Sequence, residues 1–300
     1  MRRRDFVKGV GALSLASSSL SFVAEKRKKK LVVLHTNDQH SRIDPFPMNH
    51  PQYPGMGGFA RRAAIIDKIR AEGNEVLLLD AGDVFQGTPF FNFYGGELEF
   101  KLMSMMGYDA MTIGNHDLDN GIEGLIKQIP HASFPILNAN YGVENSALSE
   151  KVKPYKVFNR GGFKVGVYGI GVELAGLVQD ENYRGLVYQD PVKISQHVEK
   201  KLKEKEGCDI IICLSHLGYS YESKKISDLE LAKQLQYTDL IIGGHTHTFL
   251  DAPVNIVNSY RKKIFISQTG WAGINLGRID FECDKNEGEL KVDSTMVKIL

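Results

Sequence analysis

The sequence predicts an α/β protein in which layers of β-sheet are covered by helices. Short apolar runs alternate with amphipathic segments through residues 31–242, and from residue 264 onward the pattern changes to strands alone. Polar residues of the types that bind metal ions follow five of the apolar runs. Because no internal repeat or low-complexity linker interrupts residues 31–300, we expect them to form one domain.

Strands are expected where short apolar runs are bounded by Gly, Pro or polar residues. These runs cover residues 31–34, 75–79, 109–113, 134–137, 155–158, 163–169, 209–214, 240–242, 264–267, 275–282 and 290–299. Two of them flank Arg160-Gly161-Gly162 and should form an antiparallel pair. Helices are expected where apolar residues recur every three or four positions, over residues 57–71, 97–106, 121–129, 192–206 and 229–235.

Residues 1–30 have the composition of an export signal. They carry a net charge of +7, and Arg3 and Arg4 precede Phe6, Lys8 and an apolar run over residues 9–24. This pattern resembles a twin-arginine signal, which implies a periplasmic or otherwise exported protein. The run is too short and too rich in Ser and Gly for a transmembrane helix, so we expect no stable membrane anchor. The alternative is a disordered basic N-terminus, and the cleavage point stays open.

The charge of the remaining chain excludes one class of partner. Outside residues 1–30 the net charge is −6, so a basic surface for nucleic acid is not expected. The three cysteines, an odd number, are interpreted as unbridged thiols, because the strand-like run between Cys208 and Cys213 holds these two too far apart for a disulfide.

The polar segments that follow the apolar runs predict a site for two divalent metal ions. They are Asp38-Gln39-His40, Gly82-Asp83, Gly114-Asn115-His116-Asp117, His216 and Gly244-His245-Thr246-His247. In open α/β sheets ligands bind at the carboxyl ends of strands, so these segments should converge. Carboxylate, imidazole and amide groups without a thiolate suit Zn, Mn, Fe or Mg. Two such ions close together are the usual means of hydrolysing phosphate esters.

The combined motifs resemble the calcineurin-like metallophosphoesterases. Within that family, Asp80-Ala81-Gly82-Asp83-Val84-Phe85-Gln86-Gly87 and Gly114-Asn115-His116-Asp117-Leu118-Asp119 resemble the 5′-nucleotidase / UDP-sugar hydrolase / 2′,3′-cyclic phosphodiesterase group. The resemblance covers about residues 31–300. It implies a four-layer αββα sandwich and a hydrolase of phosphate esters, with nucleotides as the expected substrates and cyclic nucleotides or UDP-sugars as alternatives.

The resemblance also implies a role for each residue of the site. The first metal ion would be held by Asp38, His40 and His247, the second by Asn115, His216 and His245, and both by Asp83. A water activated by the metal ions would attack phosphorus. His116 would not bind metal but would stabilise the transition state or protonate the leaving oxygen. Asp119 would hold its imidazole, although a helix N-cap is an alternative role for this Asp.

The group implies a second, substrate-binding domain, which would begin where this sequence stops, at Leu300. Three hypotheses follow: a stand-alone phosphoesterase, the catalytic half of a split nucleotidase with a separate substrate-binding protein as partner, and a metal-binding protein without turnover. The presence of His116 and Asp119 argues against the third. A thiosulfohydrolase is a minor alternative. The remaining histidines, His35, His50, His131 and His197, are expected to be structural or exposed.

Overall fold

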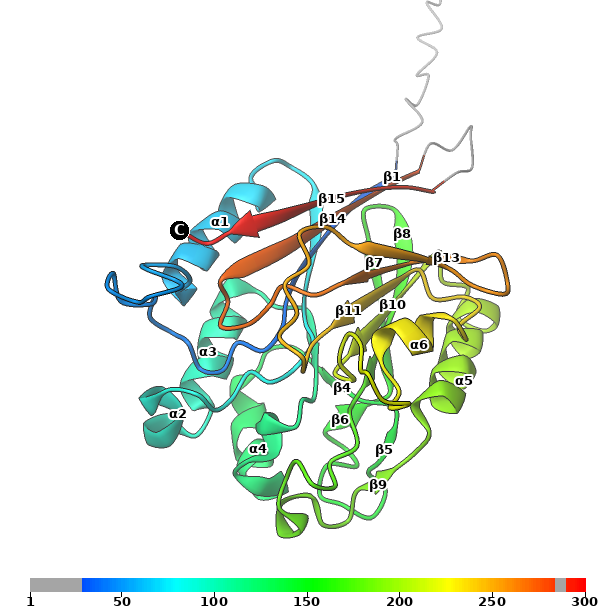
Figure 1. Ribbon diagram of the computed structural model, residues 1–300. Coiled ribbons are helices and arrows are strands. Elements are labelled where there is room, and N and C mark those ends of the chain that lie inside the picture. Colours follow the sequence, from blue (N-terminus) through cyan, green and yellow to red (C-terminus); the bar gives the residue numbers. More distant parts are fainter. Residues whose placement is uncertain (1–28, 284–289) are drawn as a thin grey trace, which may run out of the picture.

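The computed structural model describes residues 29–283 and 290–300, so nearly all of the predicted export signal lies outside the described residues. Two β-sheets lie face to face, and helices cover the outer face of each sheet (Figure 1). This arrangement is the predicted four-layer αββα sandwich. Within the described residues no helix is both long and apolar enough to cross a bilayer.

The first sheet has seven strands. Its order is β15 (Leu290–Lys298), β14 (Asn275–Cys283), β1 (Lys29–Thr36), β2 (Glu75–Asp80), β3 (Ala110–Thr112), β4 (Ile136–Leu137) and β6 (Val152–Lys153). The strands from β1 to β6 run parallel, whereas β14 and β15 are antiparallel to their neighbours. The carboxyl ends of β1, β2 and β3 therefore meet at one edge of this sheet.

The second sheet has six strands, and its interior is also parallel. Its order is β12 (Val254–Val257), β13 (Lys263–Ser267), β11 (Leu240–Gly243), β10 (Ile210–Ser215), β8 (Phe163–Ile170) and β7 (Tyr155–Arg160). The edge strands β7 and β12 are antiparallel to their neighbours, which confirms the predicted pair around Arg160-Gly161-Gly162. A separate antiparallel pair joins β5 (Tyr141–Gly142) and β9 (Val187–Tyr188).

Three apolar layers hold the four structural layers together. In β1, Leu31 and Val33 point into the core between the sheets, while Val32 and Leu34 point toward the helices on the other face. This alternation is the period of two that a strand imposes on its side chains. The first sheet is covered by α1 (Phe59–Arg70), α2 (Pro89–Tyr94), α3 (Glu97–Met106) and α4 (Gly121–Gln128), and the second by α5 (Pro191–Glu204) and α6 (Asp228–Ala232) (Figure 1).

Several elements differ from the sequence-based expectation. Helix α2 was not predicted, because its six residues are too few to show a helical period; Pro89 begins it and Gly95, in the left-handed region, ends it. The two-residue strands β5, β6 and β9 and the edge strand β12 were also missed. Strand β1 begins at Lys29, two residues before the predicted start. The three cysteines are unbridged, as predicted.

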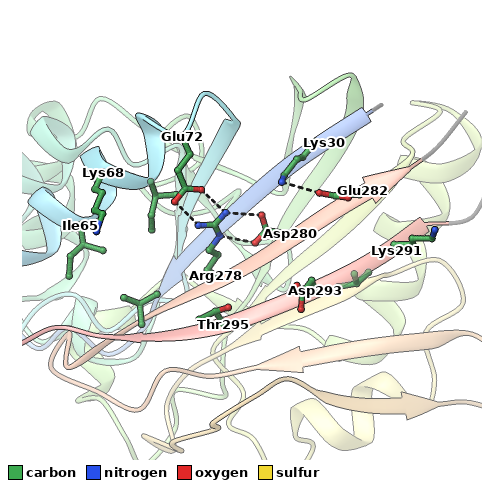
Figure 2. Close-up of a pocket in the computed structure, with 13 residues that line it drawn as sticks. Lys30, Ile65, Lys68, Glu72, Arg278, Asp280, Glu282, Lys291, Asp293 and Thr295 are labelled. Atoms are coloured by element: carbon green, nitrogen blue, oxygen red, sulfur yellow. Dashed lines mark hydrogen bonds and ion pairs between the residues drawn. The ribbon is translucent and has the colours of Figure 1, made fainter. Parts of the chain in front are cut away.

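Charged side chains line a hollow where α1 leaves part of the first sheet uncovered. Its volume is about 710 Å³. Figure 2 shows the residues that line it. Arg278 donates to both oxygens of Glu72, in the turn after α1, at 3.0 and 2.8 Å, and to Asp280 at 2.7 and 3.0 Å. Lys30 pairs with Glu282 at 2.9 Å. None of the predicted metal ligands lines the hollow. We therefore interpret the Arg278–Glu72 pair as the junction between the turn after α1 and the antiparallel end of the sheet, and the Lys30–Glu282 pair as a contact between β1 and β14.

His35 is a neutral imidazole enclosed in the first sheet. It is fully buried in β1 opposite Gly277 of β14, and neither ring nitrogen has a hydrogen-bond partner. A Cβ at position 277 would lie 2.0 Å from His35 Nε2, so glycine is needed there to make room for the ring. Burial lowers the pKa of His35 to about 3.

We predict that His35 makes the folded state sensitive to acid. Between its unfolded pKa, near 6.5, and its folded pKa, about 3, only the unfolded chain binds the proton. The contribution of His35 to the free energy of unfolding is therefore complete above pH 6.5 and falls by about 1.4 kcal/mol per pH unit below it. Urea unfolding at several pH values should give a shallower pH slope for His35→Leu. The exposed His197→Leu is the matched control, and equal slopes for both variants and the wild type would contradict the prediction.

Candidate metal centre

Five strands deliver the predicted site residues to one edge of the sandwich. Asp38 and His40 follow β1, Asp83 follows β2, and Asn115 and His116 follow β3. From the second sheet, His216 follows β10, and His245 and His247 follow β11. Within each sheet these strands run parallel to one another, and the site residues follow their carboxyl ends. The structure thus brings together side chains that lie up to 209 positions apart in the chain.

The first ligand set contains Asp38, His40 and His247, whose ligand atoms all lie within 4.8 Å of one another. His40 Nε2 lies 3.0 Å from His247 Nε2, and His247 Nε2 lies 3.4 Å from Asp38 Oδ1. Ligand atoms stand about 2 Å from an ion such as zinc, so atoms about 3 Å apart can share one ion. The first ligand set therefore has the chemistry and the spacing of a divalent metal site.

The second ligand set contains Asp83, His216 and His245, again within 4.8 Å of one another. His216 Nε2 lies 3.0 Å from Asp83 Oδ2 and 4.0 Å from Asp38 Oδ1, so it also connects the two sets. Asn115 Oδ1 is buried and has no hydrogen-bond partner, while the next residue, His116, donates its backbone N–H to Asp83 Oδ1 at 2.7 Å. A buried amide oxygen without a donor fits a metal ligand.

Backbone carbonyls orient two of the imidazoles. His216 Nδ1 lies 2.7 Å from Ala81 O, and His40 Nδ1 lies 3.3 Å from Phe85 O. A carbonyl accepts a hydrogen bond from Nδ1–H, which leaves Nε2 free on the side of the ring that faces the ligand sets. This tautomer is the one that a metal ion requires of both rings.

The charges of the site also fit a cation. Burial lowers the pKa of His40 and lowers the pKa of His245 to about 4, so both imidazoles are neutral. Burial opposes ionisation of Asp83 and His216, but their mutual attraction holds the pKa of Asp83 below its ordinary range and raises the pKa of His216 to about 10. The proton on His216 supplies a positive charge that a metal ion would replace.

His116 and Asp119 form a pair beside the ligand sets. His116 Nδ1 lies 2.9 Å from Asp119 Oδ2, and the His116 ring centroid lies 5.4 Å from that of His40. The hydrogen bond that His116 Nδ1–H donates to the Asp119 carboxylate raises the pKa of His116. The N-cap position of α4 belongs to Asn120, so the alternative role considered for Asp119 is not seen. The geometry leaves His116 Nε2 available to a substrate.

Sequence reasoning quoted Asp117 in a motif but gave it no role. Its buried carboxylate accepts hydrogen bonds from four backbone N–H groups, at distances of 2.8 to 3.2 Å, and these belong to Asp83, Val84, Phe85 and Gly114. Asp117 therefore joins the loop after β2 to the loop after β3. The one signal in the sequence was an Asp two residues after Asn115. It could not reveal the contact, because three of the four N–H donors belong to the distant residues 83–85.

A metal-dependent phosphatase is the class of protein that this fold and these two ligand sets define. Residues 31–249 match the family of calcineurin-like phosphoesterases, and the chain belongs to this family. The sequence-based recognition of the family is therefore confirmed. The assignment of individual ligands and of His116 and Asp119 stays a prediction.

Several of the relatives that the chain resembles are named 5′-nucleotidases. Snake venom 5′-nucleotidase from Crotalus adamanteus is 39% identical over 246 residues, which are 80% of this chain and 39% of that protein. The 5′-nucleotidase of Vibrio cholerae is 34% identical over 289 residues, 88% of this chain and 50% of that protein. The solved 5′-nucleotidase precursor of Thermus thermophilus matches with a TM-score of 0.81 and 30% identity, over 90% of this chain and 54% of that one. The chain thus spans about half or less of the length of these relatives.

We predict that Asp117→Ala destabilises the protein and empties the metal centre. The substitution leaves four N–H groups without their acceptor, and each buried unsatisfied group costs about 1–3 kcal/mol. Thermal unfolding should show a loss of at least about 3 kcal/mol, and the bound metal should decrease. Asp67→Ala, on the exposed side of α1, is the control. Wild-type stability and metal content in Asp117→Ala would contradict the proposed role of Asp117 in joining the two loops.

Proposed function

We propose that this chain is a metal-dependent hydrolase of phosphate esters that acts on nucleotides. The observation that carries the proposal is the convergence of the two ligand sets, joined by the 4.0 Å approach of His216 to Asp38, beside the His116–Asp119 pair. A protein that only bound metal would have no need of an oriented imidazole next to its ligands. The names of the relatives support nucleotides as substrates.

The residues of the site would divide the reaction between them. Asp38, His40 and His247 would hold one divalent ion, Asn115, His216 and His245 the other, and Asp83 both. When bound, the two ions would supply positive charge to the phosphoryl oxygens and would lower the pKa of water. His116 would donate the proton of Nε2–H to the leaving oxygen, and Asp119 would hold the ring at Nδ1 in the orientation for that transfer. Water would thus add to phosphorus while the alcohol leaves protonated.

Export and partnership rest on sequence alone. We propose that residues 1–30 direct export by the twin-arginine route and that residues 31–300 form the catalytic domain; cell fractionation is the measurement that tests this. A separate substrate-binding protein stays a prediction, and co-purification tests it. A substrate panel of a nucleoside monophosphate, a cyclic nucleotide, a UDP-sugar and a thiosulfate ester would distinguish the remaining alternatives.

We predict that metal removal and Asp83→Ala each abolish hydrolysis of an aryl phosphate. A bound metal ion supplies several kcal/mol of transition-state stabilisation, so kcat/KM should fall at least about a thousandfold. Asp83 lies between the ligand sets and is buried, whereas Asp67 is exposed on α1, so Asp67→Ala is the matched control. Steady-state assays with and without a chelator give the result. Turnover that persists after complete metal removal would overturn the proposed function.

We predict that His116→Ala lowers kcat by about 10²–10⁴-fold while both metal ions stay bound. The loss should be larger for a nucleoside monophosphate than for an aryl phosphate, because the poorer leaving group needs the proton more. Asp119→Asn should lower kcat less, since the imidazole remains but loses its orienting carboxylate. Metal analysis accompanies the kinetics. Loss of metal from His116→Ala would show instead that His116 is a ligand.

A further inference from the structure

Gln39 lies between two buried charges of opposite sign. It belongs to the loop after β1, between the predicted ligands Asp38 and His40. Its Oε1 accepts a hydrogen bond from Arg62 of α1, and its Nε2 donates to Asp80 Oδ2 at 2.8 Å. Gln39, Arg62 and Asp80 are all fully buried. The two ends of one amide group therefore connect a guanidinium to a carboxylate.

The guanidinium of Arg62 is enclosed. It lies 4.2 Å from the ring centroid of Phe59, and a Cβ at Gly273 would come within 2.1 Å of its Nη1. Within the described residues, Nε and Nη1 of Arg62 have no hydrogen-bond partner, and its Nη2 donates to Gln39. A buried cation with few partners is costly to the fold, so the amide oxygen of Gln39 is an important acceptor.

The carboxylate of Asp80 has donors on both oxygens. Oδ2 accepts from Thr36 at 2.6 Å as well as from Gln39, and Oδ1 accepts from the backbone N–H of Gly82 at 2.9 Å. Burial raises the pKa of Asp80 to about 6, while these hydrogen bonds and the charge of Arg62 act against the rise. Asp80 is therefore ionised at pH 8, and the amide of Gln39 is oriented by opposite charges at its two ends.

The side chain of Gln39 anchors the loop on the side away from the first ligand set. Its Nε2 lies 3.5 Å from Met103 Sδ, in the apolar core between the first sheet and its helices. Its neighbours Asp38 and His40 instead place their ligand atoms in the first set. Both neighbours have left-handed backbones, with φ of 48° and 49°, which persist only where contacts enforce them. The anchored Gln39 is one such contact.

Arg62 acts on the loop of the first set alone. Of the predicted ligands of the second set, Asn115 follows β3, His216 follows β10 and His245 follows β11. Arg62 makes no side-chain hydrogen bond to any of these three loops in the part of the chain that the structure describes. A change at Arg62 should therefore affect the two sets unequally.

We propose that Arg62 is a positioning residue that holds Asp38 and His40, through Gln39, in the arrangement that binds the first metal ion. This inference rests on the ligand assignment of the proposed function and deepens it, because it makes the first ion depend on Arg62 and the second ion independent of it. Loss of a group that orients metal ligands lowers metal affinity about 10–100-fold.

Calorimetric titration of Mn²⁺ into the chelator-treated full chain at about pH 8 tests this proposal without turnover. His245→Ala removes a ligand of the second set and leaves the first set intact, whereas His40→Ala does the reverse. In the His245→Ala background, Arg62→Met should weaken Mn²⁺ binding about 10–100-fold. In the His40→Ala background, Arg62→Met should change the affinity by less than about twofold.

A neighbouring arginine provides the matched control. Arg61 is an exposed residue of α1 that donates to Gly55 O, so Arg61→Met should leave both affinities within about twofold. Gln39→Met removes the amide that Arg62 contacts and should reproduce the selective loss at the first set. If Arg62→Met does not fold, Gln39→Met decides the proposal. Thermal unfolding shows which variants fold.

The outcomes separate this proposal from the proposed function. Equal losses at both sets, or no loss at the first set in a folded variant, would overturn the role of Arg62 even if the wild type hydrolyses phosphate esters. If the wild type binds Mn²⁺ at both sets but hydrolyses no ester, the proposed function fails. A selective loss at the first set then still supports the role of Arg62.

Discussion

One buried carboxylate, that of Asp117, holds together the part of the structure on which the site depends. It accepts four backbone N–H groups from the loops after β2 and β3, and those loops carry Asp83 and Asn115. Without this acceptor the N–H groups would be buried and unsatisfied, because the strands that precede the loops have ended. The same contact places His116, one residue earlier, against Asp83. A buried residue that is not itself a predicted ligand thus determines where the predicted ligands and the predicted acid lie.

A second constraint is the left-handed backbone of the ligands themselves. Asp38, His40, Asp83, His245 and His247 all have φ between 48° and 70°. Such conformations cost about 1 kcal/mol or more each and persist only where neighbouring contacts enforce them. Here the loop after β1 is hydrogen-bonded along the loop after β2: Asp38 N donates to Gly82 O and His40 N to Asp83 O. Behind them, Gln39 donates to the buried Asp80 and accepts from the buried Arg62. The fold therefore supports the strain at the residues whose side chains must converge.

The sequence was sufficient to predict the layers and the strand ends, but it could not predict the contacts between distant segments. Apolar period and motif order predicted the strands before Asp38, Asp83 and His216, because local residue choice encodes both. The ring contacts among Tyr53, Phe249 and Trp271 could not be predicted, since three loops meet there only after the two sheets have packed. The role of Asp117 was hidden for the same reason. Helix α2 was missed because six residues carry too little periodicity. Local propensity was sufficient to predict most elements, but the sequence did not show which distant segments come close together.

The two partly exposed imidazoles indicate the side from which a substrate approaches the site, which composition alone could not show. His116, with Asp119 behind it, and His247, with Trp271 stacked on it, are partly exposed, whereas the side chains of Asp38 and His216 are fully buried. A phosphate ester has a leaving group on one side of phosphorus and must admit water on the other. An acid at His116 therefore requires the leaving group to lie on the partly exposed side of the site, where His116 lies. The exposed side of His116 thus determines both the direction of approach and the position of the leaving oxygen.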